Sequence, residues 1–112
     1  MNKTTETRLQ DHANILARQV EYGFDAVDGS DDSPIMDFLE GVLDWEWIIA
    51  SDKETLLGAR LLVAFGGPNI WIDTRKGLVE GYWWGSSAFA SFDTDTDNAR
   101  DLADYLDMIW DC

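Results

Sequence analysis

Three apolar runs joined by two short turns constrain the fold of this chain more than any other feature of its sequence. The runs lie between Leu57 and Trp84 and are rich in the branched and aromatic residues that favour strands. The first turn, at 66–69, combines glycine, proline and asparagine, and the second, at 75–77, ends in glycine. Because these residue types reverse a chain, the segment predicts an antiparallel meander.

The segments on either side of the meander predict a further strand and three helices. Alternating large apolar residues predict a strand over Leu43–Ser51. Apolar residues at helical spacing predict a helix from about Thr5 to Val20 and another after Thr94 or Thr96, either of which can cap it. Ser33-Pro34 is typical of a helix start.

The stretch at 85–92 is compatible with a loop or with a short extra strand, because its residues are small. We therefore predict one α+β domain over residues 1–112. Its antiparallel sheet has about four strands, with N-terminal helices and a C-terminal helix packed on one face.

The most unusual property of the composition is its large negative net charge. The chain has 22 acidic and 8 basic residues and a formal net charge of −14, more than solubility requires. Such a surplus disfavours nucleic acid and anionic membranes as partners and favours basic surfaces, although plain solubility is a competing explanation. No apolar run approaches the roughly 20 residues of a membrane helix, and the single cysteine is Cys112. We expect a soluble cytoplasmic protein without internal disulfides.

The acidic residues concentrate in two segments. Nine acids and no Lys or Arg lie between Gln19 and Ser51. In the C-terminal helix, aspartates recur every three or four residues, so they fall within a sector of about 120° and span about 21 Å. The candidate partner-binding residues are Asp25, Asp28, Asp31 and Asp32 in the first segment and Asp97, Asp101, Asp104, Asp107 and Asp111 in the second.

The charges of the C-terminal helix are spaced about 5 Å apart, comparable with the 3.4 Å rise per phosphate of a DNA strand. Solvated helix faces usually interleave lysine with glutamate. Here aspartate, a poorer helix former, is repeated, and only Arg100 offsets it. The pattern favours a row of carboxylates that occupies a groove built for a phosphate backbone, while an ordinary solvated face remains compatible with it.

The start of this helix also carries a weak calcium-loop pattern. Asp93, Asp95 and Asp97 stand at the first, third and fifth positions, and Asp104 at the last. The glycine that such a loop needs in its middle is replaced by Asn98, and Asp104 is shorter than the usual glutamate. Helix capping explains the pattern better, so we expect no metal and no cofactor and keep a calcium-binding module as an alternative.

The meander ends in three adjacent aromatic residues, Tyr82, Trp83 and Trp84. Neighbouring tryptophans on a strand point to opposite faces, so only one can enter the core. The others form a possible apolar anchor for a partner, since tryptophan is common in binding hot spots. Sheet packing is the competing explanation.

Catalysis lacks candidates in this sequence. It has no Ser-His-Asp or Cys-His set, no phosphate-binding glycine loop and no zinc pattern, and we expect its one histidine, His12, at the surface. We therefore expect no enzyme.

The acidic segments Glu21–Glu46 and Asp93–Asp111, together with length, charge and the α+β plan, give the chain a resemblance to a known class. It resembles the small acidic anti-CRISPR and antirestriction proteins that phages and plasmids encode. The resemblance implies a non-catalytic inhibitor that occupies the nucleic-acid site of a Cas effector or restriction enzyme in a bacterial host, by DNA mimicry. An immunity protein or antitoxin against a basic nuclease toxin is the alternative.

Overall fold

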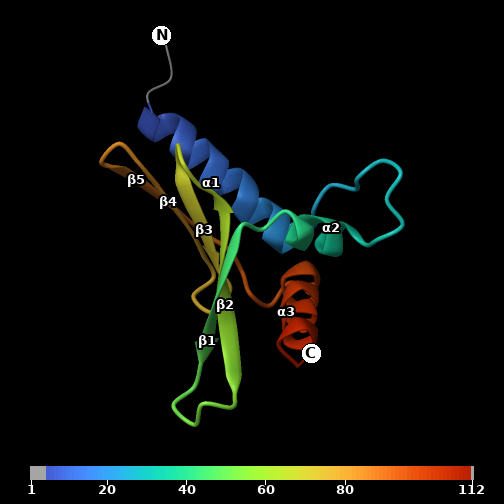
Figure 1. The fold of residues 1–112 in the computed structure, drawn as a ribbon. Coiled ribbons are helices and arrows are strands. Elements are labelled where there is room, and N and C mark those ends of the chain that lie inside the picture. Colours follow the sequence, from blue (N-terminus) through green and yellow to red (C-terminus); the bar gives the residue numbers. More distant parts are fainter. Residues whose placement is uncertain (1–4, 112) are drawn as a thin grey trace.

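An antiparallel sheet with helices on one side forms the centre of the computed structural model, which describes residues 5–111 (Figure 1). The single cysteine, Cys112, lies outside the described residues. In chain order the elements are α1 (Thr5–Tyr22), α2 (Pro34–Glu40), β1 (Asp44–Ile49), β2 (Leu56–Ala64), β3 (Asn69–Asp73), β4 (Leu78–Trp83), β5 (Ser86–Ser91) and α3 (Asp97–Asp111). The predicted α+β class, with an antiparallel meander and helices at both ends of the chain, is confirmed.

The sheet has five strands in the order β1-β2-β3-β4-β5, one more than the predicted number of about four. The additional strand is β5, from the segment that the sequence left open between loop and strand. A turn at Trp84 and Gly85, both with positive φ, reverses the chain into it. Its inward residues are small because they lie under a helix: Ala88 is only 2% exposed.

One face of the sheet is covered by α1 and α3, and we call it the covered face (Figure 1). The strand register aligns Leu61, Ile72 and Val79 on this face, and all three are fully buried. Helix α1 crosses β4 and β5 so closely that a Cβ on Gly81 would stand 2.9 Å from Leu9 Cδ1. On the opposite, open face there is no helix among residues 5–111.

Two contacts fix α3 against the rest of the covered side. The Asn98 side chain donates from Nδ2 to the backbone oxygens of Gln19, at 2.9 Å, and Val20, at 3.0 Å. The Val20 carbonyl lies in the last turn of α1, where helical partners run out, whereas the Gln19 oxygen also accepts from the Gly23 amide at 2.9 Å. At the other end of α3, the ring of Trp110 lies 5.3 Å from that of Trp47 on β1.

The predicted helix starts hold in detail. Ser33 caps α2 through a 3.3 Å bond from the Met36 amide to its hydroxyl. Of the two threonines considered for α3, Thr96 is the cap, and its hydroxyl accepts from the Ala99 amide at 3.2 Å. His12 is exposed, as predicted. No helix within the described residues is both long and apolar enough to cross a membrane.

Replacing Asn98 by alanine should lower the free energy of unfolding by about 1–3 kcal/mol, because the variant removes both hydrogen bonds between α3 and α1 and leaves the Val20 carbonyl without this donor. Asn14→Ala is the matched control, since Asn14 is exposed and its side chain accepts only from Gln10. We expect the control to change stability by less than about 0.5 kcal/mol. Equal urea denaturation midpoints for the two variants would contradict this role for Asn98.

Candidate partner-binding surface

The five aspartates predicted on the final helix form a continuous exposed row along α3. They lie opposite Leu102 and Leu106, each only 1% exposed, which seat the helix in the core. Because the apolar side is held by the core, the carboxylates project from a fixed support over about 21 Å. The row consists of Asp97, Asp101, Asp104, Asp107 and Asp111, all exposed.

The loop before α2, which carries the first predicted acidic segment, contacts α3 at its end. The Ser33 hydroxyl, at the end of the loop, lies 3.0 Å from the Tyr105 hydroxyl of α3. At the beginning of the loop, Phe24 stacks on Phe38 of α2 with ring centroids 4.1 Å apart. The loop acids Asp25, Asp28, Asp31 and Asp32 are all exposed. Two segments far apart in the sequence therefore contact each other through Ser33 and Tyr105.

Helix α2 adds two carboxylates that the sequence analysis did not single out, Asp37 and Glu40. Together with Asp32 they form a group whose carboxylate oxygens lie within 4.8 Å of one another, a set that could hold a cation. The Ser30 hydroxyl donates to Asp37 Oδ1 at 2.8 Å and stabilises part of this charge. We define the acidic surface as Asp25, Asp28, Asp31, Asp32, Asp37, Glu40, Asp97, Asp101, Asp104, Asp107 and Asp111.

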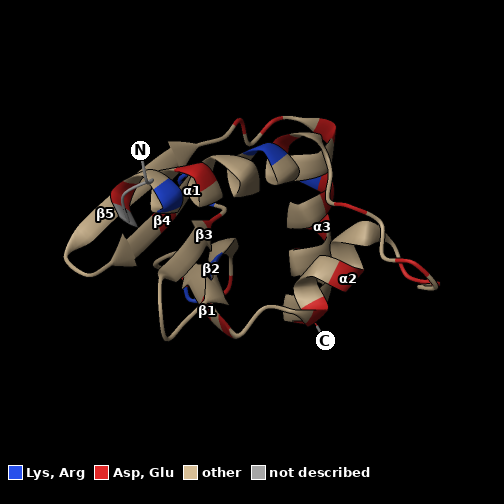
Figure 2. Cartoon of the chain, turned by 90° about the horizontal axis from the view of Figure 1, so that it is seen from above, with Lys and Arg blue, Asp and Glu red and all other residues tan. Residues whose placement is uncertain are grey.

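Basic residues do not balance the acidic surface. In Figure 2 the loop and α2 carry red and no blue, in accord with the absence of Lys and Arg between Gln19 and Ser51. On α3, Arg100 is exposed and falls within the sector of the aspartates, where it lies 3.8 Å from Asp95, a residue that is not part of the acidic surface. An exposed pair at this distance contributes little, so most of these carboxylates keep their charge available to a partner.

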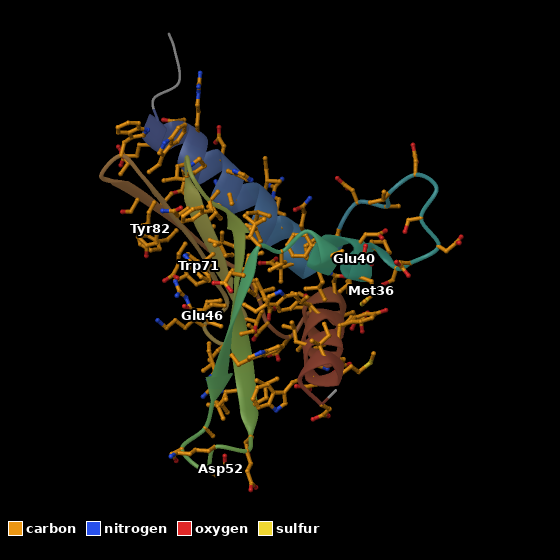
Figure 3. The ribbon with its side chains drawn as sticks, in the orientation of Figure 1. Met36, Glu40, Glu46, Asp52, Trp71 and Tyr82 are labelled. Atoms are coloured by element: carbon orange, nitrogen blue, oxygen red, sulfur yellow. The ribbon has the colours of Figure 1, made fainter. Side chains whose placement is uncertain are left out.

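Arg60, on the open face at the middle of the sheet, is paired with two glutamates. Arg60 donates to Glu46 at 2.8 Å and to Glu80 at 3.0 Å, and it lies 4.4 Å from the centroid of the Trp71 ring. Burial opposes its charge, but the hydrogen bonds to the two glutamates prevail and raise the pKa of Arg60. Figure 3 shows Glu46 and Trp71 on this open side. One arginine with two glutamates leaves a single net negative charge, and all three groups are paired, so the open face differs from the acidic surface.

Asp52, an acidic residue outside the acidic surface, stabilises the β1–β2 turn through hydrogen bonds. The Thr55 hydroxyl, followed by the amides of Glu54 and Thr55, lowers the pKa of the Asp52 carboxyl in the β1–β2 turn. Because the pKa of Asp52 is lower in the folded state, its ionised carboxyl stabilises the turn at pH values above the ordinary pKa, 3.8. This contribution is lost as the pH falls through the lowered pKa. Asp52 therefore has a local structural role.

The residues of the calcium-loop pattern are also used locally. Asp93 Oδ1 accepts from the Asp95 amide at 2.8 Å, and Asn98 is bonded to α1. Within residues 5–111, no three of Asp93, Asp95, Asp97 and Asp104 come together as a possible cation group, whereas Asp32, Asp37 and Glu40 do. The segment forms the turn and cap before α3.

The predicted aromatic anchor lies away from the acidic surface. Trp83 is half-buried against the core, in agreement with the expectation that only one of the paired tryptophans enters it. Tyr82 is 40% exposed on the open face, and Trp84, in the β4–β5 turn, is 84% exposed. Together they border an open depression of about 440 Å³. In Figure 1 this turn lies at the far end of the sheet from α3.

The structure offers a different apolar residue within the acidic surface. Met108 is 61% exposed and lies four residues after Asp104 and seven after Asp101, on the same side of α3. The helical spacing of the sequence already places Met108 on the same side as these aspartates. Met108 is the apolar side chain best placed to contact a partner that binds the aspartates.

Comparisons with known proteins identify no relative. No protein-family model matches the chain, and neither curated proteins nor solved structures give a match.

Raising the salt concentration should raise the melting temperature. Between about 0.01 M and 0.15 M salt the Debye length falls from about 30 Å to about 8 Å, which screens the repulsion among the carboxylates of the acidic surface. Thermal unfolding followed by circular dichroism measures the effect. Asp104→Lys/Asp107→Lys should show a smaller increase than the unsubstituted protein. A melting temperature that falls over this range would show that the repulsion is not significant.

Proposed function

We propose that this chain is a non-catalytic inhibitor that binds the positively charged nucleic-acid site of a bacterial defence protein, a Cas effector or a restriction enzyme, by mimicking phosphate charge. The observation that supports this most strongly is the acidic surface, in which exposed carboxylates lie on α3 and on the loop before α2, two distant segments that contact each other at Ser33 and Tyr105. The proposed setting is the cytoplasm of a bacterial host.

The support behind the carboxylates favours mimicry over a flexible acidic tail. The row on α3 is backed by fully packed leucines and joined to α1 through Asn98. A rigid row loses little conformational entropy when a partner binds it. Its charges, about 5 Å apart, can replace several phosphates of a strand in a channel lined by Lys and Arg.

The cost of the acidic surface to the fold also supports a binding role. Asp107 and Asp111 lie in the last turns of α3, where the helix dipole disfavours negative charge. Aspartate is also a poorer helix former than glutamate. Locally unfavourable residues without a structural gain are typical of functional sites.

A nuclease toxin presents the same kind of basic site, and the acidic surface would suit an immunity protein or antitoxin equally well. The tagged protein, incubated with purified Cas effectors, restriction enzymes and nuclease toxins, distinguishes these targets. Binding to a target that competing DNA displaces, and that salt weakens, supports mimicry. Binding that ignores competing DNA would place the contact outside the nucleic-acid site.

Reversing two charges in the row should weaken inhibition more than reversing two elsewhere. Asp104→Lys/Asp107→Lys should raise the inhibitory constant by at least about tenfold, since contacts between close charge pairs at interfaces are worth more than about 1.4 kcal/mol. Glu6→Lys/Glu54→Lys changes the net charge equally but alters exposed residues of α1 and the β1–β2 turn. Equal loss in both double variants would mean that only total charge matters.

Truncating the apolar side chain in the row tests its contact separately. Met108→Ala should weaken binding to the target by about five- to tenfold, as for a hot-spot residue worth more than about 1 kcal/mol, and leave the salt dependence unchanged. Phe65→Ala, which removes another exposed apolar side chain, 73% exposed in the β2–β3 turn, should have no effect. Isothermal titration calorimetry of both variants measures the difference, and unchanged affinity of Met108→Ala would remove this residue from the interface.

A further inference from the structure

The sheet is open, so β1 and β5 each present an edge, and the two edges differ in chemistry. Strand β1 carries Asp44 and Glu46, and its pairing with β2 shifts register between Ile48 and Ile49. Charges and irregularities are features that protect an edge from added strands. Strand β5, with the sequence SSAFAS, has no charge and no proline, and it pairs with β4 without a shift.

Hydrogen bonds define which backbone groups of β5 point outward. The Phe92 amide donates inward to the Gly77 oxygen at 2.9 Å, whereas the Phe89 oxygen accepts from Gln10 Nε2 of α1, outside the sheet, at 2.8 Å. Because successive residues of a strand alternate in direction, the backbone groups of Ser87, Phe89 and Ser91 point away from β4. The amide of each is therefore available to an added strand.

A groove runs beside this edge. It is an open depression of about 1000 Å³ between α1 and the end of β5, and its lining includes Ile15, 56% exposed, and Tyr22, 78% exposed. On the open face, Phe89 is 47% exposed and packs edge-on against Tyr82. Apolar side chains therefore flank the edge on both sides, as an added strand requires, since its side chains alternate between the two faces.

The charge around the β5 edge favours a basic peptide over a second copy of the chain. The groove is lined by Asp11, Glu21 and Arg18, and Asp93 follows β5, so carboxylates outnumber cationic groups there. A second copy of the chain would bring a further net charge of −14, and the two copies would repel each other. An extended segment rich in Lys or Arg would be attracted instead.

We propose that β5 binds an extended basic peptide segment as a sixth strand, held by backbone hydrogen bonds to Ser87, Phe89 and Ser91. The added strand lies along the outer edge of β5, with α1 on one side and the open face on the other. When Gln10 is displaced from the Phe89 oxygen, that oxygen becomes one more acceptor for the peptide. This binding site is separate from the acidic surface and stands whether or not the inhibitor function is correct.

The probe is a fluorescent peptide of alternating lysine and valine, about ten residues long, which is at the upper end of strand lengths and enough to span the 6 residues of β5. It is titrated at about 0.15 M salt, where long-range attraction is screened, with a glutamate–valine peptide of equal length as the charge control. Amide hydrogen exchange followed by NMR reports where it binds. We expect new protection at the amides of Ser87, Phe89 and Ser91 with the lysine peptide alone.

Ser87→Pro and Ser87→Ala form the matched pair of variants. Proline at an outward position of an edge strand removes the donor of an added strand without removing a ladder bond, whereas alanine keeps that donor. Ser87→Pro should weaken peptide binding about tenfold, the loss of roughly one backbone hydrogen bond, and Ser87→Ala should not. Melting temperatures of both variants verify that the fold is retained.

Three outcomes would overturn this site. The first is that the peptide protects amides from exchange, or changes NMR chemical shifts, only in α3 and the loop before α2. The second is equal affinity of Ser87→Pro and Ser87→Ala for the peptide. The third is protection of the β5 amides that appears without peptide and grows with protein concentration, since it would assign the edge to a second copy. Asp104→Lys/Asp107→Lys should still bind the peptide at β5, which keeps this test distinct from that of the inhibitor function.

Discussion

Burial of the sheet on one face only is the constraint on which the rest of the structure depends. The apolar stripes of α1 and α3 share a single core with the covered face, through residues such as Leu9, Leu61 and Leu102. Gly81 permits the close approach of α1, and Asn98 joins the two helices. Since the apolar side of α3 is used completely in this packing, its aspartates must face solvent. The acidic surface is therefore a direct result of how the core is built.

The remaining surfaces have distinct chemistry because charge is segregated among them. On the open face, Arg60 lies between Glu46 and Glu80, and the three groups largely satisfy one another. The edge at β5 is uncharged, while the opposite edge at β1 is acidic. Unbalanced charge is left mainly on the loop, α2 and α3. Asp37 and Asp97 suit the first turns of their helices, whereas Asp107 and Asp111 oppose the helix dipole. This separation is the physical reason to connect the acidic surface with a partner.

Local patterns in the sequence were sufficient for most of the fold but not for the assembly of the site. The meander and the starts at Ser33 and Thr96 depend on neighbouring residues, so they could be predicted. The sequence leaves strand β5 open between loop and strand, because the small size of its inward residues Ala88 and Ala90 is set by the helix above them and not by strand propensity. The meeting of the two acidic segments depends on the tertiary contact between Ser33 and Tyr105. No spacing rule indicates such a contact, nor that Trp84 lies far from α3.

Because Met108 lies within a row of aspartates, the association rate and the dissociation rate of a partner depend on different side chains. The field of the aspartates reaches across a Debye length, about 8 Å at physiological salt, and accelerates encounter with a cationic surface. Met108, 61% exposed on the same side of α3, acts only at contact, where burial of its side chain slows dissociation. Association and dissociation on this side of the molecule are thus controlled by different atoms, and each can change without the other.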